Sequence, residues 1–93
     1  MAQIEVEIRV GAEVLESCIK SDENPVKLRR LILDYVYNLP VEKTGLDKAT
    51  RKNDDSIWMR LTQVINGEWV ESAVFLTDGA DIIFRRIRGE SNE

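Results

Sequence analysis

The apolar residues between Leu28 and Leu39 recur at the period of an α-helix, and this stripe constrains the possible folds more than any other feature. The stripe consists of Leu28, Leu31, Ile32, Tyr35, Val36 and Leu39. The polar segment 21–24 is rich in capping residues, Pro25 suits the first helical position, and Pro40 cannot continue a helix. We therefore predict one helix that begins at Pro25 and ends near Asn38. Laying this one amphipathic helix across a sheet is the obvious way to bury the apolar faces of both.

Alternating apolar residues at the start of the chain predict the first strands of that sheet. The alternating residues are Ile4, Val6, Ile8 and Val10. A period of two with polar residues between them is typical of a strand with one buried and one solvated face. Gly11-Ala12 supplies a turn, and the segment from Glu13 to Lys20 suits a second strand that pairs back on the first.

The C-terminal third of the chain has the signals of further strands joined by tight turns. Ile57 to Leu61 alternates as a third strand, and Asn66-Gly67 is the residue pair that two-residue hairpin turns favour. Trp69-Val70 would then be a short return strand. Asp78-Gly79 repeats the turn chemistry, and Asp81 to Phe84 is predicted to be a buried strand.

These elements predict a single α+β domain over residues 1–89. The charged segment 41–56 has few apolar anchors and is expected to be a long surface loop, and residues 90–93 are expected to form a flexible tail. A chain of 93 residues has room for one compact core. Such a core argues against a deep, enclosed active site.

The composition argues against several classes of function. The chain has no histidine and one cysteine, Cys18, so it lacks the commonest general base and metal ligand, and we predict no enzyme, metal site or cofactor. A net charge of −4 argues against a general nucleic-acid binder. No apolar run could cross a membrane and no signal-peptide pattern occurs at the start, so a cytoplasmic location is expected.

Two motifs of the C-terminal third carry a resemblance to a known family. VINGEWV at 64–70 and LTDGADIIF at 76–84 are similar to the turn and last-strand motifs of small sulfur-carrier proteins, namely the small subunit of molybdopterin synthase and the thiamine-pathway carrier. The element order also resembles the ubiquitin-like β-grasp fold to which those proteins belong. The resemblance implies a mixed sheet of about four to five strands on one amphipathic helix.

In that family the C-terminal glycine is activated by a partner enzyme and converted to a thiocarboxylate or joined to a lysine. This chain has Gly89 followed by Glu90 in place of a Gly-Gly end, so trimming of residues 90–93 would be needed to expose that glycine. The resemblance implies a non-enzymatic carrier or modifier that contacts an activating enzyme or a larger enzyme subunit. The expected partner-binding residues are Trp69, Arg85, Arg86, Arg88 and Gly89.

Other interpretations of these residues remain open. The protein could instead be a non-covalent binding or regulatory subunit that recognises its partner by a sheet edge or by the 41–56 loop. The arginines after Phe84 could simply protect an edge strand from aggregation. Of Trp58 and Trp69, at least one is expected in the core, with Trp69 the more exposed, and Cys18 is expected to be a small buried hydrophobic residue.

Overall fold

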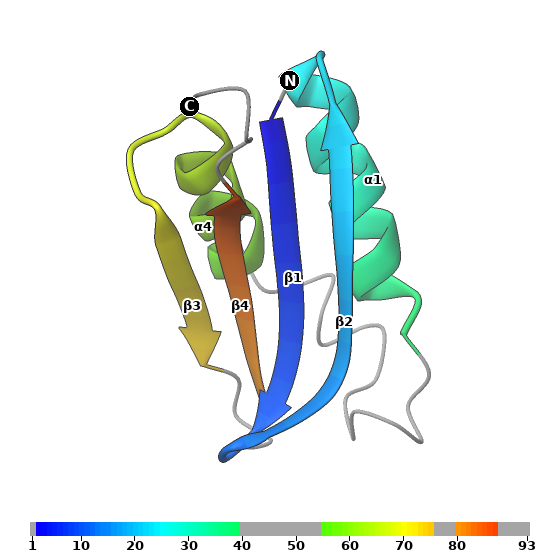
Figure 1. The fold of residues 1–93 in the computed structure, drawn as a ribbon, viewed down its shortest axis with the longest axis vertical. Coiled ribbons are helices and arrows are strands. Elements are labelled where there is room, and N and C mark those ends of the chain that lie inside the picture. Colours follow the sequence, from blue (N-terminus) through cyan, green and yellow to red (C-terminus); the bar gives the residue numbers. More distant parts are fainter. Residues whose placement is uncertain (1, 40–54, 76–79, 88–93) are drawn as a thin grey trace.

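In a computed structural model, which describes residues 2–39, 55–75 and 80–87, two helices cover one face of a four-stranded sheet (Figure 1). The elements in chain order are β1 (Ala2–Val10), β2 (Glu13–Asp22), α1 (Pro25–Tyr37), α4 (Asp55–Ile65), β3 (Glu71–Phe75) and β4 (Ala80–Ile87). The strand order across the sheet is β2-β1-β4-β3. The predicted α+β class is confirmed.

The two ends of the described chain meet in the centre of the sheet. β1 pairs with β2 through the predicted turn at Gly11, which has a φ of 62°, and on its other side β1 pairs with β4. Inward-facing Val6 lies opposite Phe84 in that second pair. Each of the three strand pairs in the described residues is antiparallel, so the parallel pair that a mixed sheet requires is not found there.

The helix α1 forms where the sequence predicts it. The side chain of Asn24 accepts hydrogen bonds from the backbone N–H groups of Val26 and Lys27, Pro25 occupies the first turn, and the helix is capped at Asn38. Its sheet-facing stripe is buried, namely Leu28, Ile32, Val36 and the following Leu39. Leu31, which the stripe also includes, is exposed, so the buried face is narrower than the sequence indicates.

A second helix, α4, replaces the strand predicted at Ile57 to Leu61. Its buried residues are Ile57, Leu61, Val64 and Ile65, whereas Met59 between the first two is exposed. A spacing of four residues fits both the strand and the helix period, but continuation at Val64 and Ile65 fits only the helix. Residues 55 and 56 of the predicted 41–56 loop belong to α4, and residues 41–54 lie outside the described ranges.

Asn66-Gly67 ends α4 and does not form a hairpin turn. The N–H of Gly67 donates to the carbonyl of Val64 at 3.1 Å, and the N–H of Glu68 donates to the carbonyl of Gln63 at 2.9 Å. This pair of bonds, with Gly67 at a φ of 84°, is the Schellman arrangement that closes many helices. The predicted return strand at Trp69-Val70 is also wrong because β3 begins at Glu71; the turn predicted at Asp78-Gly79 lies outside the described residues.

We expect Gly67→Ala to lower the free energy of unfolding by about 1–2 kcal/mol, because a Cβ atom is disfavoured at positive φ. Apart from Gly67 and its two chain neighbours, no atom of the described residues lies within 4 Å of the position that this Cβ would occupy, so the cost would be conformational and not a packing clash. Gly67→Asn is the matched control and should cost less, since asparagine tolerates this conformation. Urea denaturation measures both, and an alanine variant as stable as the wild type would contradict this helix end.

The described helices and strands alternate in direction along the sheet. In Figure 1, β2 runs up the view, α1 runs down, α4 runs up and β3 runs down. β4 then runs up the view, opposite to β1, so these two central strands pair antiparallel.

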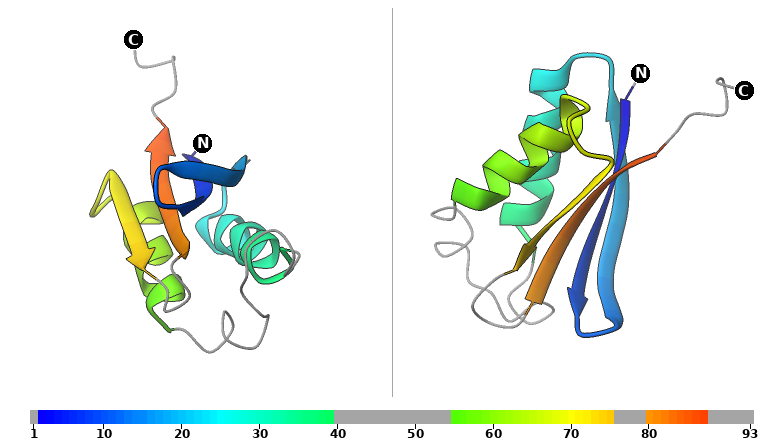
Figure 2. Two further views of the ribbon diagram at one scale, coloured as in Figure 1. Left: turned by 90° about the horizontal axis from the view of Figure 1, so that it is seen from below. Right: turned by 90° about the vertical axis from the view of Figure 1, so that its left-hand side faces the viewer.

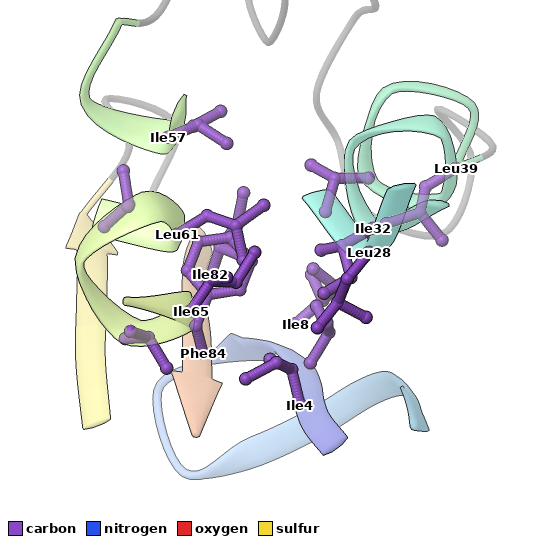
Figure 3. Close-up of a cluster of buried hydrophobic side chains, with 14 residues drawn as sticks. Ile4, Ile8, Leu28, Ile32, Leu39, Ile57, Leu61, Ile65, Ile82 and Phe84 are labelled. Carbon is purple, nitrogen blue, oxygen red and sulfur yellow. The ribbon is translucent and has the colours of Figure 1, made fainter. Parts of the chain in front are cut away.

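The core lies between the two helices and the inner face of the sheet (Figures 2 and 3). Inward-facing side chains of the central strands supply one half, and the buried stripes of α1 and α4 supply the other. The labelled core residues in Figure 3 are Ile4, Ile8, Leu28, Ile32, Leu39, Ile57, Leu61, Ile65, Ile82 and Phe84. The opposite face of the sheet has no described helix over it (Figure 2).

Candidate functional site

Arg85, predicted to bind a partner, faces outward from β4 and is tied to carboxylates of the sheet. Its guanidinium lies 2.6 Å from Glu5 and 3.1 Å from Glu71 on the neighbouring strands, and 3.7 Å from Glu7. Hydrogen bonds to Glu71 and Glu5 raise the pKa of Arg85 above its ordinary value. These contacts link three strands, which leaves this guanidinium less available to a partner.

Arg86, the next predicted site residue, points in the opposite direction, towards α4. Its Nη2 donates to the carbonyl oxygens of Val64, at 2.9 Å, and of Ile65. The last carbonyls of a helix have no partner within the helix, and a basic side chain is a favourable donor to them. Arg86 therefore closes the C-terminal end of α4 and holds that helix on the sheet.

The remaining predicted site residues have different outcomes. Trp69 lies between α4 and β3 and is 54% exposed, more than Trp58 at 46%, as expected. The expectation that at least one tryptophan belongs to the core is wrong, since Trp58 stacks on the surface against the Arg29 guanidinium, 4.7 Å from the ring centroid. Arg88 and Gly89 lie outside the described residues.

The two edges of the sheet differ in how they are protected. At the β2 edge, Ile8 pairs with Glu16 and Arg9 with Val14, so Leu15 is an extra residue that forms a bulge. The same strand has four charged residues along its ten positions: Glu13, Glu16, Lys20 and Asp22. Bulges and charges are the usual means by which a protein prevents another strand from pairing with an edge.

The β3 edge has neither protection. Its five residues include one charge, Glu71, which is already paired with Arg85, and no register shift occurs between β3 and β4. The strand ends at Phe75, which is 76% exposed, and it follows Val70, which is 67% exposed. Together with Trp69, these residues form an apolar rim, and we call the strand and this rim the β3 edge.

The backbone of β3 presents unpaired groups at this edge. The carbonyl of Val70 accepts from the N–H of Arg86 at 2.7 Å, so residues 70, 72 and 74 direct their backbone groups towards β4. Backbone groups alternate along an antiparallel strand, and those of Glu71, Ala73 and Phe75 therefore face away from β4. No described strand lies beyond them.

Two features of the described residues bear on metal binding and on the reactivity of the single cysteine. No group of three or more Cys, Asp or Glu side chains within residues 2–39, 55–75 and 80–87 could hold a metal ion. Cys18 is half-buried against the core, and this burial raises the pKa of its thiol despite the nearby Lys20 charge. A thiol with a raised pKa is a poor nucleophile at neutral pH. Neither described helix is long and apolar enough to cross a membrane.

Comparison of the chain with protein-family models, with curated proteins and with solved structures found no match. The geometry of the described residues therefore carries the functional argument by itself. Within that geometry, the β3 edge combines unpaired backbone groups with exposed apolar side chains. It is the candidate functional site.

Sequence reasoning identifies only Trp69 in this site. It places Val70 in a hairpin strand and does not include Phe75 among the binding residues. A usable signal is present, because positions 69–75 contain four large apolar residues, Trp69, Val70, Val74 and Phe75, and a single charge. That signal indicates a binding surface only once the strand order is known to place β3 at the edge of the sheet.

Proposed function

We propose that this protein is a non-enzymatic binding module that recognises a partner protein by adding an extended segment of that partner to the β3 edge. The observation that carries the proposal is the difference between the two edges: β2 has a bulge and four charges, whereas β3 has neither a bulge nor a free charge. Addition of a strand to an exposed edge is a recurring mode of peptide recognition.

The chemistry of the edge defines the segment that would bind. Backbone hydrogen bonds to Glu71, Ala73 and Phe75 would supply affinity without sequence preference, while apolar contacts with Phe75 and Val70 would select the side chains of the partner. A second copy of β3 is a poorer partner. The strand has five residues, and the surface area that five paired residues bury falls well below the roughly 1,200–2,000 Å² of standard interfaces. A longer apolar segment that also covers Trp69 fits the exposed surface better.

A random peptide library displayed on phage tests this proposal and does not require the partner to be identified first. We expect selection on the wild-type protein to enrich peptides with apolar residues at alternate positions. A synthetic peptide of the enriched sequence should shift the backbone amide signals of β3 in NMR spectra of the labelled protein. Phe75→Lys should weaken its binding by about tenfold or more, since an edge lysine opposes strand addition.

The matched control is Ile19→Lys, which places the same charge at an exposed position on β2, the other edge. This variant should bind the selected peptide within about twofold of the wild type, a difference well under 1 kcal/mol. Peptides that bind both variants equally well, or that shift signals of β2 instead of β3, would refute the assignment of the edge.

A ubiquitin-like carrier role is the second candidate, and the position of β4 favours it. This strand is paired on both sides, with β1 and β3, so the segment that follows Ile87 is attached to a central strand of the sheet. Against it, Asn66-Gly67 closes a helix, which removes the hairpin from the motif that supports the β-grasp resemblance. The role would require ATP-dependent adenylation of the Gly89 carboxylate, followed by attack of a sulfur donor that displaces AMP.

Intact mass measurement distinguishes the carrier role. Protein truncated after Gly89 would be incubated with ATP, a sulfide source and an activating enzyme. The carrier role predicts the mass increase of an oxygen-to-sulfur exchange, whereas a Gly89→Ala variant of the same length should react less. An unchanged mass, with peptide binding at β3 intact, would leave the binding module as the function.

A further inference from the structure

The outer face of the sheet, beside the β3 edge, carries more negative than positive charge. This face lies opposite the two helices (Figure 2), and alternate residues of β1, β4 and β3 point to it. Its carboxylates are those of Glu5, Glu7, Glu71 and Asp81, and its guanidinium groups are those of Arg9 and Arg85. The cations on these three strands therefore balance only half of the carboxylates.

One row of outward-facing residues crosses the sheet and ends at the β3 edge. In this row, Glu5 of β1 lies opposite Arg85 of β4, and Arg85 lies opposite Glu71 of β3. The charges alternate in sign, and the guanidinium contacts the two carboxylates at 2.6 and 3.1 Å. The next position in the row would belong to a strand added at the edge. A cation at that position would continue the alternation, since opposite charges at facing positions stabilise a strand pair and like charges destabilise it.

Glu71 keeps the capacity to accept such a cation. Its side chain is 52% exposed, and the guanidinium that it contacts is shared with Glu5 and Glu7. One positive charge does not neutralise three carboxylates. The backbone N–H and carbonyl of Glu71 also face away from β4, so an antiparallel partner would place one residue directly opposite Glu71 in a hydrogen-bonded pair.

The same face of β3 defines two further positions of the partner. Ala73 and Phe75 alternate with the buried Ser72 and Val74 and so point outward with Glu71, and Phe75 is largely exposed. Apolar side chains opposite Ala73 and Phe75 would cover this apolar surface. The three described strand pairs are antiparallel, the more stable arrangement per residue. An antiparallel partner would carry, in chain order and at every second position, two apolar residues and then a basic one.

We infer that the β3 edge selects a cationic segment of a partner protein, which pairs antiparallel with β3 and places a lysine or arginine opposite Glu71. The inference rests on the proposed strand addition and names the segment that the edge prefers. A second copy of β3 does not supply the cation, because Glu71 is the only charged residue of the strand. Nucleic acids and anionic membranes fit less well, since the carboxylates of the outer face would repel them.

Parallel selections from one phage-displayed peptide library test this inference. Selection on the wild type should enrich lysine or arginine two positions after an apolar residue. Selection on Glu71→Lys should enrich aspartate or glutamate at that position, because the charge opposite it is reversed. Glu13→Lys is the matched control, since it changes the net charge equally at an exposed position on β2, the other edge. This variant should select the same basic residue as the wild type.

Synthetic peptides of the sequence enriched on the wild type measure the effect. The peptide with lysine at the basic position should bind the wild type at least about fivefold more tightly than the same peptide with glutamate there. The difference should shrink as the salt concentration increases. In Glu71→Lys the order of the two affinities should reverse. Glu71→Gln removes the charge and keeps the shape, so it should reduce the difference to about twofold or less. This variant covers the case in which a lysine beside Arg85 distorts the edge.

Two sets of results would overturn the inference, and NMR amide shifts of the wild-type complex separate them. Peptides that shift the signals of β3 but show no basic preference, or that keep this preference in both Glu71 variants, would refute the charge pairing and leave strand addition in place. Wild-type selections that enrich no peptide, or only peptides that bind away from β3, would refute the proposed function together with this inference.

Discussion

Phe84→Ala is expected to lower the free energy of unfolding by about 3–5 kcal/mol, which is a large part of the total stability of a domain of this size. Phe84 is fully buried on central strand β4, opposite Val6 on one side and Ser72 on the other. Its side chain lies in the core beside Ile65 and Ile82 (Figure 3), so its removal would leave a cavity that the sheet cannot close. Urea denaturation and the thermal midpoint measure the loss.

The other phenylalanine of the chain is the matched control. Phe75 ends β3 with 76% of its surface exposed, so Phe75→Ala should change the free energy of unfolding by no more than about 0.5 kcal/mol. The same substitution at two phenylalanines would then separate a residue required for folding from one that is free for binding. A destabilisation of Phe75→Ala comparable with that of Phe84→Ala would mean that the β3 edge is covered within the molecule.

Arg86→Ala is expected to cost about 2–3 kcal/mol, because it removes two charged hydrogen bonds to the carbonyls at the end of α4. In the wild type, the Nε of Arg86 is buried without a hydrogen-bond partner, which is unfavourable. Removing the side chain also removes this cost, so we expect a smaller loss in the free energy of unfolding than two charged hydrogen bonds alone would give. The loss should appear in the helical circular dichroism and in the urea midpoint. Arg86→Met, which keeps the aliphatic volume, should recover part of the stability.

Arg85→Ala is the control one position earlier in the chain. Its ion pairs lie at the outer surface with a third of the side chain exposed, so solvent screening limits the loss to about 0.5–1 kcal/mol. The contrast between the two arginines should persist at high salt, where the contribution of Arg85 weakens further. Equal losses at both positions would contradict the assignment of Arg86 as the residue that holds the helix end.

These expectations bear directly on the proposed function. The basic segment after Phe84 resembles a single partner-binding surface in the sequence, but the side chains of Arg85 and Arg86 project from opposite faces of β4 and each has a structural task. We therefore propose recognition at a surface with unmet hydrogen-bonding capacity, which in the described residues is the backbone and the apolar rim of the β3 edge.

Local signals are sufficient for much of the fold. The caps at Asn24 and Asn38 and the stripe between them specify α1, and the alternation from Ile4 to Val10 specifies β1. The strand at Asp81 to Phe84 also forms as predicted, within the longer β4. Each of these signals depends on residues a few positions apart, so the sequence alone contains the information.

Other signals are ambiguous because two structures share the same local chemistry. Ile57 and Leu61 are four residues apart, a spacing that places them on one face of either a strand or a helix. Asn66-Gly67 allows a positive φ, which a hairpin turn and a helix end both require, and here only Gly67 adopts it. The helix assignment depends on burial of Val64 and Ile65 against the sheet.

The sequence by itself determined the α+β class, the helix α1, the N-terminal hairpin and the buried last strand, because those follow from periodicity and capping within short segments. Only the tertiary structure decided the direction of β4, the separate roles of Arg85 and Arg86, and the exposure of Phe75. Each of these depends on how distant elements are arranged around the sheet and on which strand lies at its edge. Such facts arise from packing between distant segments, which no local pattern encodes.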